Sequence, residues 1–177
     1  MTLAICSRAA FARPQLEGTT MGFGLKTEAH FNAAHFLTDF QGKCENIHGH
    51  RWRVVVYLYA DTLDTSGENR DMLIDFGVFK KAVREEVAKF DHQFIVERGS
   101  LANDTIACLE RETFSLLMVD FRTTAENFAR YFYTRLSSRG FGVSRVDVYE
   151  TPNNCAIYYG PCGGPHDGSD ASVVHMA

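Results

Sequence analysis

The chain has 177 residues, of which 45% are hydrophobic and 23% charged, and its formal net charge is −4. These values are typical of one soluble globular domain, and they exclude a wholly disordered chain, a collagen and a coiled coil. Its apolar runs are far shorter than the roughly 20 residues that a membrane span needs. The mild negative charge supplies no broad basic surface. We therefore expect neither a membrane partner nor a nucleic-acid partner.

The two ends of the chain differ in composition from the middle. Residues 1–21 begin with an apolar stretch, but Ser7 and Arg8 interrupt it before a signal-peptide core is complete. Two arginines and a single acid in this stretch leave a transit peptide as the alternative to a disordered leader. Residues 161–177 are rich in Gly, Pro, Ser and Asp, which is typical of a mobile tail. We predict a disordered leader, a domain over residues 22–160, and a mobile tail.

Cysteine usage indicates the cellular compartment. The chain has five cysteines, an odd number, at spacings that suggest no disulfide framework. Free thiols are usual in a reducing compartment. We therefore predict a cytoplasmic protein.

The first half of the domain is predicted to hold strands followed by a helix. Alternating apolar residues over 25–31 indicate a strand, and the Val- and Tyr-rich segment 51–60 indicates a longer one. A polar turn follows, which predicts a hairpin to a strand at 72–75. Asp75 is placed to cap a helix that starts near Val78. The apolar stripe of this helix comprises Phe79, Val83, Val87 and Phe90.

The second half is predicted to hold a hairpin, a helix and two last strands. Residues 106–110 and 113–119 indicate the hairpin, turning near Arg111. Thr123 and Glu126 have the spacing of a capping box ahead of the helix, which ends at Gly140. The last strands cover residues 143–151 and 156–159. Strands that run in sequence, with helices between them, predict an antiparallel α+β domain.

The densest cluster of metal-binding residue types is the segment 44–50, with the sequence Cys-Glu-Asn-Ile-His-Gly-His. On an extended segment the spacing of His48 and His50 places both imidazoles on one face. His35 is placed to supply a third donor from a neighbouring strand. Three histidines and one open position are typical of a catalytic zinc. The alternative is that His48 and His50 are polar loop residues.

Cys44 admits several roles: zinc ligand, nucleophile, base, or small buried hydrophobe. A fourth His or Cys donor would close the coordination shell and make the zinc structural. If Cys44 stands off the metal, the cation and the nearby Lys43 favour its thiolate form.

The adjacent pair Asp91 and His92, and the separate Glu150, are further candidates for functional residues. Asp91 and His92 are adjacent, so His92 is interpreted either as a general acid–base charged by Asp91 or as a helix-end residue near the dipole. Glu150 lies at the end of an apolar strand face that carries Val146 and Val148. A carboxylate there needs a partner, such as the paired N–H donors of a pterin ring. Its alternative is an exposed strand-end residue.

In their order along the chain, these segments resemble the family of 6-pyruvoyltetrahydropterin and 6-carboxytetrahydropterin synthases. The matching segments cover nearly the whole domain: residues 31–35, 44–50, 72–76, 91–92, 123–127 and 149–151. The resemblance implies a tunnelling-fold unit, an antiparallel four-stranded sheet with two helices on one face. It also implies a homo-trimer or homo-hexamer whose sheets join into a barrel and whose active sites lie between subunits. The stretch 97–120 is longer than in compact members, and we interpret it as the added hairpin.

The same resemblance implies a role for each candidate residue. Zinc is expected on three histidines, catalysis on a Cys-Asp-His trio, and pterin binding on three further residues. The zinc ligands are His35, His48 and His50; the catalytic residues are Cys44, Asp91 and His92; the substrate-binding residues are Glu150, Thr124 and Glu126.

The spacing within the cysteine–histidine segment bears on the reaction. Three residues separate Cys44 from His48, which resembles the 6-carboxytetrahydropterin synthases of queuosine-precursor biosynthesis. Such an enzyme converts 7,8-dihydroneopterin triphosphate to 6-carboxytetrahydropterin, with loss of acetaldehyde and triphosphate. The alternatives are a 6-pyruvoyltetrahydropterin synthase, a zinc hydrolase, and a non-catalytic zinc protein that binds pterin.

Overall fold

The computed structural model describes residues 21–160. The predicted leader, apart from Met21, and the predicted tail lie outside the described residues. Within residues 21–160, none of the helices has the length and apolar content needed to cross a membrane.

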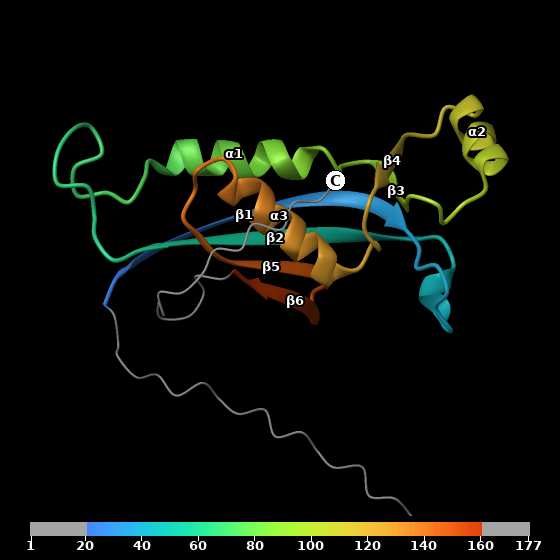
Figure 1. The fold of residues 1–177 in the computed structure, drawn as a ribbon, viewed down its shortest axis with the longest axis horizontal. Coiled ribbons are helices and arrows are strands. Elements are labelled where there is room, and N and C mark those ends of the chain that lie inside the picture. Colours follow the sequence, from blue (N-terminus) through green and yellow to red (C-terminus); the bar gives the residue numbers. More distant parts are fainter. Residues whose placement is uncertain (1–20, 161–177) are drawn as a thin grey trace, which may run out of the picture.

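A single mixed sheet forms the centre of the described structure, with strand order β4-β3-β1-β2-β5-β6 (Figure 1). β1, β2, β5 and β6 pair antiparallel, whereas β3 and β4 run parallel to each other and to β1. The prediction of a four-stranded antiparallel sheet therefore left out the two parallel strands β3 and β4. The strands are β1 Phe23–His35, β2 His48–Ala60, β3 Gln93–Glu97, β4 Leu116–Val119, β5 Val143–Thr151 and β6 Asn154–Tyr159.

Two helices, α1 (Phe76–Ala88) and α3 (Ala125–Ser137), lie on one face of the sheet, as Figure 1 shows. Between them and the sheet lies an aromatic core that includes Phe31, Trp52 and Phe128, all of which are fully buried. The predicted helix cap is confirmed, because the Asp75 side chain accepts a hydrogen bond from the N–H of Val78. The helix itself begins two residues earlier than predicted, at Phe76.

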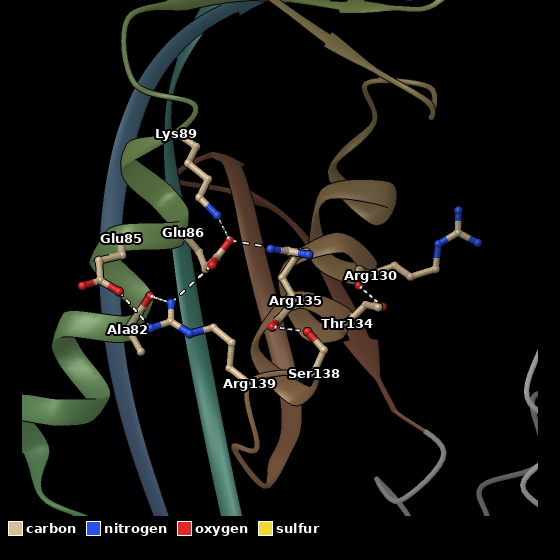
Figure 2. Close-up of polar contacts among 9 residues, drawn as sticks. All are labelled: Ala82, Glu85, Glu86, Lys89, Arg130, Thr134, Arg135, Ser138 and Arg139. Carbon is tan, nitrogen blue, oxygen red and sulfur yellow. Dashed lines mark hydrogen bonds and ion pairs between the residues drawn. The ribbon is translucent and has the colours of Figure 1, made fainter. Parts of the chain in front are cut away.

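An ion-pair network joins α1 to α3 (Figure 2). The Glu86 side chain is 4% exposed and faces three cations at distances of 2.6, 3.6 and 3.2 Å: Lys89, Arg135 and Arg139. Arg139 also reaches Glu85 at 2.8 Å. Glu86 lies on α1 and Lys89 caps its C-terminus, whereas Arg135 lies on α3 and Arg139 follows it. The network therefore links the two helices.

The predicted strand over residues 72–75 is wrong, because this segment folds back on the turn before it. The N–H of Met72 donates to the carbonyl of Asn69, and the carbonyl of Met72 accepts from the N–H of Asp64. Asp71 between them has a φ of 62°. These local bonds use the backbone groups that a sheet ladder would need.

The predicted hairpin within residues 106–119 is also wrong. Its first half is the helix α2 (Asn103–Arg111), and its second half is β4, which pairs parallel with β3. Ile106 and Leu109 are the part-buried positions of α2, three residues apart as on one helix face. α2 lies at the end of the sheet beside β3 and β4 (Figure 1). Residues 97–120 therefore hold the helix α2 and the strand β4, which follow β3 in the chain.

Candidate metal centre and active site

Three histidines meet on the helix-covered face of the sheet, where the β1–β2 ladder ends. His35 pairs directly with His48, and Ala33 pairs with His50. Because side chains alternate along a strand, His48 and His50 share the face that carries the buried Trp52. The imidazole centroids of His35 lie 4.5 Å from His48 and 5.3 Å from His50. The structure therefore brings the three predicted zinc ligands together.

The ring nitrogens of these histidines are arranged as metal ligands require. The Nδ1 atom of His35 lies 2.8 Å from the main-chain oxygen of Thr123, and that of His48 lies 2.7 Å from the oxygen of Asn46. A carbonyl accepts, so each Nδ1 carries the proton and each Nε2 keeps a free lone pair. The Nε2 atoms of His35, His48 and His50 are buried without a hydrogen-bond partner. Three orphaned nitrogens that converge on one point fit a metal ion.

Burial keeps the imidazoles of His35 and His50 in the neutral form that binds metal. Burial lowers the pKa of His35 to about 4, and the neighbouring histidines act in the same direction. The pKa of His50 is also lowered by burial, although Glu150 opposes the shift. At neutral pH both rings are therefore uncharged, as ligand nitrogens must be. Trp52 helps to exclude water, because its ring centroid lies 5.0 Å from that of His35.

Glu150 completes a four-residue cluster with the histidines. Its Oε1 atom lies 3.5 Å from the Nε2 atoms of both His35 and His50. One ligand atom from each of the four residues lies within 4.8 Å of all the others, which makes the cluster a candidate metal centre. The sequence placed Glu150 on the face of Val146 and Val148 but indicated no contact with the histidines.

A pocket of about 300 Å³ opens beside this cluster. Its lining includes four predicted site residues: Cys44, Thr124, Glu126 and Glu150. Cys44 is part-buried in the short turn η1 (Lys43–Glu45), and its carbonyl accepts a hydrogen bond from the N–H of Leu37. It does not belong to the candidate metal centre. The pocket therefore unites the predicted substrate-binding residues with one of the three predicted catalytic residues.

The start of α3 differs by one residue from the predicted capping box. Thr124 is the N-cap, and its hydroxyl accepts from the N–H of Asn127. Thr123 instead donates its hydroxyl to the carbonyl of Phe36, while its own carbonyl faces His35. Glu126 therefore lies at the second helical position, where it cannot complete a capping box. This leaves its carboxylate free to line the pocket.

His92, which contacts Asp91, lines a different pocket of the same chain. The Nδ1 atom of His92 lies 2.8 Å from Oδ2 of Asp91, while Oδ1 of Asp91 accepts from the N–H of Asn32. The bond from Asn32, followed by that from His92, lowers the pKa of Asp91. His92 has a φ of 57° and is largely exposed, and it lines a cavity of about 450 Å³ together with His50. Within one chain, the structure does not bring His92 into the pocket of Cys44.

Sequence reasoning missed the residues that orient the site. Thr123 acts through its main-chain oxygen, which no side-chain pattern reveals. Asn32 positions Asp91 through its N–H and also accepts the N–H of His92 at 2.7 Å. Asn46 orients His48 through its main-chain oxygen. Its position inside the cysteine–histidine segment, two residues before His48, was the only indication of this role in the sequence.

Comparisons with known proteins agree with this arrangement. The family described as 6-pyruvoyl tetrahydropterin synthase matches residues 24–161. A protein of Haemophilus influenzae named 6-carboxy-5,6,7,8-tetrahydropterin synthase is 34% identical over 139 residues, which cover 77% of this chain and 98% of that protein. A Synechocystis protein of the same name is 32% identical, with coverage of 76% and 91%.

The fold has also been seen in solved structures. An uncharacterized protein of Wolinella succinogenes superposes with a TM-score of 0.68 at 22% identity, covering 79% of this chain and 99% of that one. This likeness supports the α+β fold with its curled mixed sheet. Since the family match spans most of the described residues and includes both histidine-bearing strands, the chain belongs to the 6-pyruvoyl tetrahydropterin synthase family.

Proposed function

We propose that this protein is a zinc-dependent lyase that converts 7,8-dihydroneopterin triphosphate and one water molecule to 6-carboxytetrahydropterin, acetaldehyde and triphosphate. One observation carries the proposal: three orphaned histidine nitrogens lie beside a pocket whose lining includes both Cys44 and Glu150. The relatives from Haemophilus influenzae and Synechocystis, both named 6-carboxy-5,6,7,8-tetrahydropterin synthase, support the choice of product.

His35, His48 and His50 would hold the zinc. Their neutral imidazoles suit a borderline-soft cation, and the carbonyls of Thr123 and Asn46 orient two of the rings. When bound, zinc supplies a Lewis acid that stabilises negative charge developing on the oxygens of the substrate side chain. The buried ring of Trp52, which packs against His35, keeps bulk water away from the zinc site.

Glu150 would recognise the pterin ring. A carboxylate has two acceptor oxygens, which match the paired N–H donors along one edge of a pterin. Thr124 and Glu126 line the same pocket and offer a further hydroxyl and carboxylate to the ring. A pocket of about 300 Å³ is at the lower end of the range for small-molecule sites, which suits one bicyclic ring.

Proton transfer requires a base on one side of the substrate and an acid on the other. Cys44 lines the pterin pocket and would remove a proton from the substrate as the thiolate. His92, whose Nδ1 atom is held by the carboxylate of Asp91, would move the second proton.

These two groups line different pockets of one chain, so we infer that His92 acts in the active site of a neighbouring subunit. His92 is largely exposed, as a residue offered to a partner must be. This arrangement requires a homo-oligomer, for which a trimer or a hexamer is the expectation from the sequence resemblance. Oligomerisation is thus part of the proposed catalytic mechanism.

Incubation of the zinc-loaded protein with 7,8-dihydroneopterin triphosphate tests the proposal, with products identified by mass spectrometry. The proposal predicts 6-carboxytetrahydropterin and acetaldehyde. A 6-pyruvoyl product without acetaldehyde would assign the alternative reaction. Pterin binding without turnover would indicate the non-catalytic alternative, and the Cys44→Ala variant serves as the inactive control.

A further inference from the structure

Glu150 stands between the histidine cluster and the pterin pocket, and it belongs to both. Its Oε1 atom is 3.5 Å from two of the three orphaned Nε2 atoms. Two ligand atoms of a tetrahedral zinc with bonds of ~2.0–2.1 Å are separated by about 3.4 Å. The distances of the carboxylate oxygen from His35 and His50 therefore match the spacing between ligands of one zinc ion. At the same time Glu150 lines the pocket that contains Cys44, and its side chain is 26% exposed.

The backbone at Glu150 departs from regular strand pairing. The register of β5 against β6 shifts between Tyr149 and Thr151, which places Glu150 at the irregularity. Such bulges change the direction of a side chain and are frequent next to active sites. Glu150 thus lies outside the regular β5–β6 pairing, at a point where its side chain borders both the histidines and the pocket.

We propose that Glu150 has two mutually exclusive positions. While the pterin pocket is empty, its carboxylate is the fourth ligand of the metal. When a pterin ring enters, the carboxylate turns to accept the two ring N–H groups and leaves the metal. Both ring donors require both carboxylate oxygens, so the two roles compete for the same atoms.

This inference rests on the proposed function, because it needs a metal and a pterin ligand. Its consequence is a fixed order of binding events at the site. Three histidines and a carboxylate close a tetrahedral shell, whereas catalysis requires an open position. Recognition of the pterin ring therefore opens the coordination position that the substrate side chain needs, and a ligand without that ring leaves the metal closed.

Cobalt substitution tests the first position of Glu150 without any pterin or turnover. The visible spectrum of the Co²⁺-loaded wild-type protein is compared with that of Glu150→Gln, which keeps the side-chain shape. We expect the two spectra to differ, and the affinity of Glu150→Gln for Zn²⁺ to be at least about tenfold lower in chelator competition, since even outer-shell losses cost 10–100-fold. The matched control is Glu126→Gln, which alters the same pocket away from the metal cluster.

The second position is tested with a pterin that has no side chain at carbon 6 and so cannot reach the metal itself. Its binding to wild type should shift the Co²⁺ spectrum and, by reciprocal linkage, weaken Zn²⁺ affinity by roughly 5- to 150-fold. Glu150→Gln should show neither change.

Identical cobalt spectra for wild type and Glu150→Gln would overturn the metal bond. A pterin that binds wild type, as measured by its fluorescence, but leaves the cobalt spectrum unchanged would overturn the exchange between positions. Failure of the pterin to bind at all contradicts the proposed function itself, and with it the second position of Glu150.

Discussion

The Nδ1 atom of His35 lies 2.8 Å from the main-chain oxygen of Thr123, although 88 residues separate them in the chain. This hydrogen bond joins the end of β1 to the segment that leads into α3. It points the Nε2 atom of His35 toward His48 and His50, so the geometry of the histidine cluster depends on the docking of α3 against the sheet.

Substitution of His48 by alanine should remove most of the bound zinc. His48 supplies one of three convergent Nε2 atoms, and without it only two nitrogens and the Glu150 carboxylate remain to hold zinc. Metal analysis after gel filtration measures the effect. His30→Ala is the matched control, because His30 lies on the same β1–β2 ladder but is exposed on the opposite face. Full zinc occupancy in His48→Ala would remove this residue from the ligand set.

Substitution of Cys44 by alanine should preserve zinc and abolish turnover. The thiol lines the pocket beside the histidine cluster but is not part of that cluster, so under the proposed function its loss removes a base and no ligand. We expect turnover to fall by roughly 100- to 10,000-fold, the range for general acid–base groups. Cys108→Ala is the control, since Cys108 is exposed on α2. Retained activity in Cys44→Ala would favour hydrolysis by the zinc site.

Two inactive variants should complement each other when their subunits are mixed. If Cys44 of one subunit works with His92 of another, then Cys44→Ala and His92→Ala chains form some sites in which both residues are intact. Random mixing in equal amounts restores about a quarter of the sites in a cyclic oligomer. The measurement is turnover after co-refolding of the two variants, with each variant refolded alone as the control. If mixing restores no activity although the chains co-assemble, Cys44 and His92 act within one chain.

Glu86 should contribute to stability through its contacts with both helices. Its nearly buried carboxylate meets Lys89, Arg135 and Arg139, as Figure 2 shows, but these partners are themselves partly exposed. We therefore expect Glu86→Gln to lower the free energy of unfolding by about 1–2 kcal/mol, in urea denaturation. Glu85→Gln, at an exposed position of the same helix turn, should lower it by less than about 0.5 kcal/mol.

The same residue predicts a dependence of stability on pH. Burial raises the pKa of Glu86, but Lys89 and the two arginines lower it by more, so the net pKa lies below its usual value of 4.5. A depressed folded-state pKa stabilises the fold above the unfolded-state pKa, and this contribution is lost as pH falls through the folded-state value. The difference in unfolding free energy between wild type and Glu86→Gln should therefore shrink below about pH 4.5. A difference that stays constant from pH 7 to pH 3 would contradict this assignment.

Local backbone geometry made part of this protein predictable from its sequence. Side chains two residues apart on a strand share a face, which placed His48 beside His50 without any knowledge of the fold. Asp75 was predictable as a helix cap because the bond to the N–H of Val78 spans only three residues.

The remaining features depend on contacts between segments that are distant in the chain. Short apolar runs fit a strand and a helix equally well, so residues 106–110 were predicted as a strand although they form part of α2. Parallel pairing of β3 with β4, the bond from His35 to Thr123, and the approach of Glu150 to the histidines all require the packed sheet. The sequence alone determined which residue types are available for a metal centre, because composition and local spacing are properties of the chain. Their convergence on one point was decided by strand order and helix packing, because only these bring β1, β2 and β5 side by side.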